Sequence, residues 1–110
     1  MDSKQKAITV WAYLSENAVS KRSAFKALGL EPCKNFCHAC EEAFSADGAG
    51  EFDFCAYCPL LGKWHGRRGN NLEVCGECSS HYIAWATTDN EHLKKEAARL
   101  MLINIIEEWN

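Results

Sequence analysis

The sequence has little proline, no long apolar run and no strong excess of charge of either sign. Only two of its 110 residues are proline, 47% are apolar and 25% are charged, which is the composition of a folded globular domain and not of a disordered segment. The longest apolar run, from Leu100 to Ile106, is interrupted by Asn104 and falls far short of the roughly 20 residues that span a bilayer. We therefore expect no contact with a membrane.

The first residues also lack the features of an export signal. The segment MDSKQKAITVWAYLSEN contains neither an apolar signal-peptide core nor a small-residue cleavage site, so we expect a cytoplasmic protein. Cysteines in that compartment are mostly reduced, and closely spaced reduced cysteines more often bind a metal than form disulfides. The odd total of seven cysteines also argues against a fully paired disulfide framework.

The net charge of −3 is unevenly spread along the chain. Residues 1–34 carry six basic and three acidic groups, whereas residues 35–78 carry a net −4 and residues 79–110 a net −2. Strong non-specific DNA binding depends on many phosphate contacts, and no segment is basic enough to predict it. Only the N-terminal third has a charge of the sign that a DNA contact requires.

Changes in hydrophobic periodicity divide a single domain, residues 1–110, into three segments. Residues 1–32 and residues 79–110 have helical spacing, whereas residues 33–78 have little of it and hold all seven cysteines. A bound metal can order a segment of this kind. The sequence therefore predicts a mostly helical α+β fold, with an N-terminal helical hairpin, a zinc-stapled middle of knuckles and hairpin, and a long C-terminal helix.

The N-terminal hairpin is predicted from two amphipathic stretches. The first helix should run from Ser3 to Glu16, and the second should be capped by Ser20 and terminated by Gly29. The apolar positions expected to face inward are Ala7, Val10, Trp11, Leu14, Ala24, Phe25 and Leu28.

The C-terminal segment predicts two further helices. Tyr82 and Trp85 belong to the first, and the capping-box spacing of Thr88 and Glu91 predicts that the second starts there and runs to about Glu108. The apolar residues of the second helix are Leu93, Ala97, Leu100, Met101, Ile103, Ile105, Ile106 and Trp109. Because they spread over more than one narrow face, either the domain buries this helix, or its excess apolar face meets a partner or a second copy in a homodimer.

Three Cys-x-x-Cys pairs follow one another in the middle segment and predict a zinc site. The pairs are Cys37 and Cys40, Cys55 and Cys58, and Cys75 and Cys78. Two residues between cysteines let a tight turn direct both sulfurs at one ion, and two such turns supply the tetrahedral four-thiolate site that zinc prefers. The intervals of 14 and 16 residues between successive pairs fit a hairpin closed by such an ion.

The spacing leaves open which four cysteines bind. The first and second pairs give the shortest closure, and the second and third are nearly as short. Joining the first and third pairs would place Cys78 at the start of the following helix, as in treble-clef zinc folds. A second zinc would require Cys33, His65 or His81 to join the remaining pair, so we expect one structural zinc, with two as the alternative.

The same motifs argue against catalysis. Thiol redox chemistry usually uses one exposed Cys-x-x-Cys pair in a βαβ pattern, whereas this chain has three pairs and no such pattern. A four-thiolate zinc has no open position for water or substrate. We therefore expect a binding protein and single out no catalytic residue.

Residues 36–85 resemble small cysteine-rich proteins that are common in bacteriophage genomes. The shared elements are a C-x-x-C, a C-x-x-C-P-[LI], a later cysteine and a Y-x-x-W, which here are Cys37 to Cys40, Cys55 to Leu60, Cys75 and Tyr82 to Trp85. Most such proteins have no assigned activity. The resemblance implies a zinc-binding accessory protein, and we expect it to bind and modulate a host protein in the host cytoplasm.

A second stretch is similar to HNH nucleases, whose C-terminal half often reads N-L-x-x-x-C-x-x-C-H. The matching residues are Asn71, Leu72, Cys75, Cys78 and a slightly displaced His81. That family needs an acidic residue before its catalytic histidine, but Trp64 precedes His65 here. The interval from His65 to Asn71 is also short for the usual ββα-metal hairpin, so a degenerate HNH-type nuclease is the third of three hypotheses.

Residues 18–30 are similar to the recognition-helix half of helix-turn-helix proteins. That resemblance implies that Lys21, Arg22, Ser23 and Lys26 face the major groove of DNA. The alternative is a helical hairpin that packs on the zinc module and leaves a solvated basic edge. A DNA-binding regulator is therefore the second hypothesis, after a zinc-stapled interaction protein.

Overall fold

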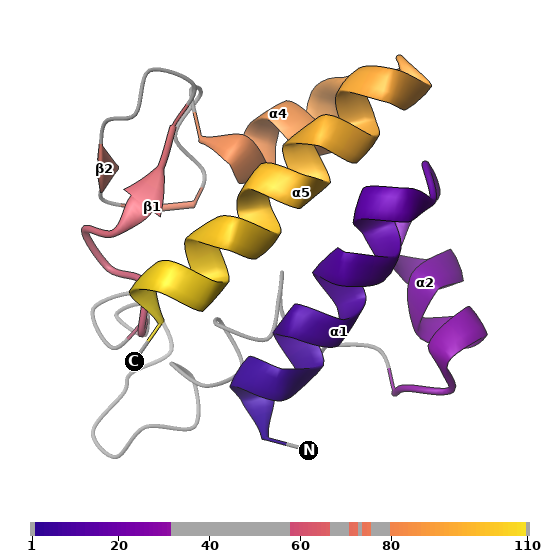
Figure 1. Ribbon diagram of the computed structural model, residues 1–110, viewed down its shortest axis with the longest axis horizontal. Helices are drawn as coiled ribbons and strands as arrows, with labels where there is room; N and C mark the ends of the chain where they lie inside the picture. The colour runs from indigo at the N-terminus through magenta and orange to yellow at the C-terminus, as the bar shows by residue number, and fades with distance from the viewer. Residues whose placement is uncertain (1, 32–57, 67–70, 73, 76–79, 110) are drawn as a thin grey trace.

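The computed structural model describes residues 2–31, 58–66, 71–72, 74–75 and 80–109, which form four helices and a two-stranded sheet. Helices α1 and α5 lie side by side and antiparallel, α2 packs on α1, and α4 packs on α5 (Figure 1). The sheet lies beside the C-terminal half of α5 (Figure 1). The mostly helical α+β fold predicted from the sequence is confirmed.

The N-terminal hairpin forms as the sequence predicts. Helix α1 spans Ser3–Glu16, and α2 spans Lys21–Leu28. The Ser20 hydroxyl accepts a hydrogen bond from the Ser23 N–H at 3.2 Å, which satisfies one of the unpaired donors at the start of α2. Gly29 ends this helix in the left-handed conformation, with φ of +67°, which glycine adopts without steric strain.

The two C-terminal helices are α4, His81–Thr87, and α5, Glu91–Glu108. The end of α5 agrees with the prediction, but its predicted cap is wrong. The Asn90 side chain accepts from the Leu93 N–H at 3.0 Å and is the cap, whereas the Thr88 hydroxyl accepts from the Asn90 N–H at 3.3 Å. Asparagine caps helices at least as well as threonine, and it is the nearer residue. Among the described helices, none is long and apolar enough to cross a membrane.

The sheet pairs β1, Trp64–His65, with β2, Asn71–Leu72, in an antiparallel register that sets Trp64 opposite Leu72. Two-residue strands are too short to produce a readable alternation of apolar and polar residues, so the sequence did not predict them. One hydrophobic core joins all three parts of the chain. Its buried residues are Ala7, Val10, Trp11, Leu14, Ala24, Phe25, Leu60, Trp64, Tyr82, Ala84, Trp85, Ala97, Ala98, Met101, Ile105 and Trp109.

Candidate metal centre

Cys58 and Cys75, one cysteine from each of the second and third pairs, lie on the two chain segments that adjoin the β1–β2 hairpin. In an antiparallel hairpin, the chain that enters the first strand and the chain that leaves the second lie at the open end. Cys58 precedes Trp64 by six residues, and Cys75 follows Leu72 by three. Both cysteines are half-buried and pack against the hydrophobic core. The hairpin therefore favours a closure that uses these two pairs.

The segment after Cys58 is held by two successive turns. The Leu61 N–H donates to the Cys58 carbonyl at 3.0 Å, and the Lys63 N–H donates to the Leu60 carbonyl at 2.8 Å. Leu60 itself is fully buried in the core. The leucine of the C-x-x-C-P-L motif thus anchors the chain next to Cys58 in the hydrophobic core.

Ser80 anchors the chain beyond Cys75. Its side chain is fully buried, and its hydroxyl donates to the Cys75 carbonyl at 2.7 Å. The same oxygen accepts from the Ile83 N–H at 3.1 Å and so caps α4. A backbone bridge also joins Ser80 to Gly66, directly after β1. One serine therefore connects Cys75 to helix α4 and to the hairpin.

Asn104 fastens the hairpin to α5. It is fully buried, and its side-chain amide donates to the Lys63 carbonyl at 2.9 Å while its side-chain oxygen accepts from the His65 N–H at 2.9 Å. Both backbone groups flank Trp64 and point to one edge of β1. The amide thus acts as a strand partner for an edge that β2 does not cover.

His65 and His81, the histidines considered as further ligands, occupy different surroundings. His65 lies opposite Asn71 on the sheet, and its Nε2 is 3.1 Å from Oε1 of Glu108 on α5. Glu108 is 43 residues away from His65 in the chain, so the sequence alone does not predict this contact. His81 is buried in the first turn of α4.

Four of the six predicted zinc ligands lie outside the described residues. They are Cys37, Cys40, Cys55 and Cys78, and Cys33 lies outside as well. Within the described ranges, no group of three or more His, Cys, Asp or Glu side chains could hold a metal ion. Zinc binding therefore stays a prediction, supported by the positions of Cys58 and Cys75.

The Y-x-x-W motif contributes an aromatic cluster to the core. Trp11 of α1 meets Tyr82 and Trp85 of α4 edge to face, with ring centroids 5.8 and 5.0 Å away. Trp64 of β1 meets Tyr82 in the same manner at 6.2 Å. Edge-to-face pairs add to the stabilisation that burial gives, so this cluster joins α1, α4 and the hairpin.

Lys21, one of the predicted DNA contacts, is directed at this aromatic cluster. Its Nζ donates to the Tyr82 hydroxyl at 2.6 Å and lies 4.4 Å from the Tyr82 ring centroid and 5.5 Å from that of Trp11. Arg22 and Lys26 are exposed on α2. The structure thus separates Lys21, which holds α2 to the core, from two basic side chains that face solvent.

Replacing Lys21 with alanine should lower the free energy of unfolding by about 1–2 kcal/mol, because a partly buried cation–π contact and a hydrogen bond are both lost. Lys26→Ala, an exposed change on the same helix, should stay within about 0.5 kcal/mol of the wild type. Urea unfolding followed by tryptophan fluorescence measures both. Equal stabilities of the two variants would contradict the structural role of Lys21.

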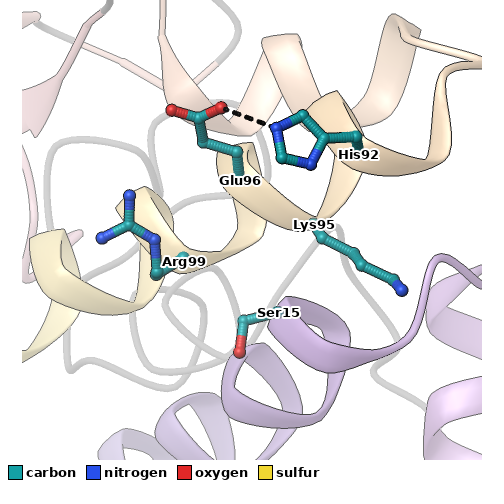
Figure 2. Close-up of a pocket in the computed structure, with 5 residues that line it drawn as sticks. All are labelled: Ser15, His92, Lys95, Glu96 and Arg99. Atoms are coloured by element: carbon teal, nitrogen blue, oxygen red, sulfur yellow. Dashed lines mark ion pairs between the residues drawn. The ribbon is translucent and has the colours of Figure 1, made fainter.

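A polar pocket of about 330 Å³ lies where the end of α1 faces the first half of α5 (Figure 2). Its lining residues are Ser15, His92, Lys95, Glu96 and Arg99. His92 and Glu96 form an ion pair at 3.9 Å, and the His92 side chain is 87% exposed, so the pair contributes little stability. The Ser15 hydroxyl is engaged with the Ala12 carbonyl at 2.7 Å. These side chains form a solvated notch, and we assign it no ligand.

Comparisons with known proteins returned no match. No protein-family model, no curated protein and no solved structure is significantly similar to this chain.

Proposed function

We propose that this chain is a small zinc-stabilised interaction protein that acts in the cytoplasm and has no catalytic activity. Its partner is a host-cell protein, as the resemblance to phage accessory proteins implies. The observation that carries the proposal is the position of Cys58 and Cys75, which flank one hairpin on its open side and pack on the same core. Cys55 and Cys78 complete the two pairs in the sequence.

The chemistry of this ligand set supports a structural zinc. Four thiolates fill the tetrahedral coordination of the ion, so such a site stabilises a fold and offers no position to a substrate. The surroundings of Cys58 and Cys75 are those of a scaffold: two tight turns, a buried serine and a buried asparagine fix the adjoining backbone. Binding of a partner is supported by the apolar residues that α5 leaves exposed, Leu93, Ile103 and Ile106.

Quantitative capture from host lysate tests this function. The zinc-loaded protein, immobilised through a terminal tag, should retain one host protein in a near-stoichiometric amount, as measured by quantitative mass spectrometry. The chelator-stripped protein should retain much less, because binding energy of a structural zinc is also folding energy. Equal background binding to both forms would contradict the proposal.

A DNA-binding regulator is the second candidate, because Arg22 and Lys26 are exposed on neighbouring turns of α2. If this candidate is correct, the protein should bind duplex DNA with an affinity that falls steeply as salt is raised, and an Arg22→Ala/Lys26→Ala double variant should lose this binding.

A degenerate HNH-type nuclease is the third candidate, because the His65 imidazole contacts the Glu108 carboxylate. If this candidate is correct, the protein should nick DNA in the presence of magnesium, and His65→Ala should abolish the nicking.

A further inference from the structure

A groove of about 340 Å³ runs between α4 and α5. Ala84 of α4 and Ala97 of α5 are both buried, and their short side chains form its floor. Leu93 and Leu100 of α5 also line it, and Leu93 is 53% exposed. The groove has the size of a pocket for a few apolar side chains of another molecule.

The groove continues into an exposed stripe along α5. The α5 stripe consists of Leu93, Glu96, Leu100, Ile103 and Glu107. Successive members are three or four residues apart, so they share one edge of the helix. Ile103 is 37% exposed, the Glu96 side chain is 48% exposed and Glu107 is exposed. Three apolar residues, of which Leu100 is half-buried, thus share this edge with two exposed carboxylates.

We propose that the groove and the α5 stripe bind an amphipathic helix of the partner protein, with lysine or arginine beside its apolar face. The inference rests on the proposed function, because it names the surface through which that partner binds. An amphipathic helix places apolar anchors into an apolar groove, and Leu93, Leu100 and Ile103 are the apolar contacts that this surface offers them. Basic residues on the partner would meet Glu96 and Glu107 and select it over acidic helices.

A second copy of this chain fits the α5 stripe less well. A two-fold pairing of the stripe would bury Glu96 and Glu107 of both copies, and burying carboxylates without cations is unfavourable. The α5 stripe itself contains no cation: the Lys94 ammonium is 3.0 Å from the Trp85 carbonyl, and Lys95 and Arg99 line the polar notch (Figure 2). Glu96 borders both the notch and the groove and is 3.9 Å from the exposed His92. A two-fold pairing of the stripe would therefore supply no cation from the stripe itself, whereas a basic helix of another protein would.

Two synthetic helical peptides of equal length test the proposal. Both have a leucine face, flanked by lysines in one and by glutamates in the other. The zinc-loaded full chain should bind the lysine peptide at least about tenfold more tightly in fluorescence anisotropy at physiological salt. The double variant Glu96→Lys/Glu107→Lys should reverse this preference. Leu93→Ser should weaken binding of the lysine peptide about tenfold without loss of folding, since Leu93 is largely exposed.

Controls separate the groove from general attraction to an acidic protein. Glu91→Lys reverses a charge two residues from Leu93, on a different side of the helix, and should leave both affinities within about twofold. Equal binding of a scrambled lysine peptide, or an unchanged preference in the double variant, would overturn the proposal. So would a wild-type dimer that Leu93→Ser converts to a monomer. These peptide measurements do not require the host protein, so they test the surface separately from the proposed function. If Leu93→Ser still captures the host protein, the proposed function is retained but the groove and the α5 stripe are not the binding surface.

Discussion

Replacing Cys58 or Cys75 with serine is expected to remove zinc from the protein and to lower its melting temperature by at least about 10 °C. Structural zinc contributes about 10–16 kcal/mol in zinc-finger peptides, whereas an entire small domain is stable by only about 5–15 kcal/mol. Each serine leaves three thiolates on an ion that requires four ligands. The wild-type protein, purified with reductant, should hold one zinc per chain by elemental analysis, and each variant should hold far less.

Cysteines outside the proposed closure provide the matched controls. Cys33→Ser and Cys37→Ser should retain one zinc per chain and the wild-type melting temperature, because the hairpin favours the second and third pairs. Loss of zinc in Cys37→Ser, with retention in Cys75→Ser, would instead assign the site to the first and second pairs. Stoichiometric zinc in both Cys58→Ser and Cys75→Ser would refute the proposed centre.

The helical part of the fold was predictable because its signals are local. Ser20 and Gly29 mark the ends of α2 through side-chain capping and a positive φ, and both effects depend on a few neighbouring residues. The cap of α5 was misassigned because Thr88 and Asn90 are both good capping residues two positions apart. Sequence preference alone does not rank such close competitors.

The attachments of the candidate site were not predictable, because each joins residues far apart in the chain. Asn104 was visible only as a polar interruption of an apolar run, although it shares a helical face with the buried Ala97 and Met101. A buried asparagine must find hydrogen-bond partners, but its partners lie about 40 residues earlier in the chain. Lys21 likewise had the charge of a DNA contact, and only tertiary structure shows that it meets Tyr82.

Replacing Asn104 with alanine is expected to lower the free energy of unfolding by about 2–4 kcal/mol. The change leaves the Lys63 carbonyl and the His65 N–H without their partner, and each unsatisfied buried group costs about 1–3 kcal/mol. The small cavity left by the lost amide adds to this effect. Urea unfolding measures the loss, and hydrogen exchange should show it first at the His65 amide.

Glu108→Gln is the matched control for Asn104→Ala, because it alters the other contact between α5 and His65. The pair of His65 and Glu108 is 24% and 30% exposed, and contacts of this kind contribute at most about 1 kcal/mol. If Asn104→Ala destabilises the protein no more than Glu108→Gln does, the buried amide does not hold the hairpin. If the Asn104 amide does hold the hairpin, Asn104→Ala should also release zinc faster to a competing chelator, because β1 links Cys58 to the helical core. Glu108→Gln should then release zinc at the wild-type rate. The Asn104 contact would thus affect both zinc retention and stability, whereas the Glu108 contact would affect neither strongly.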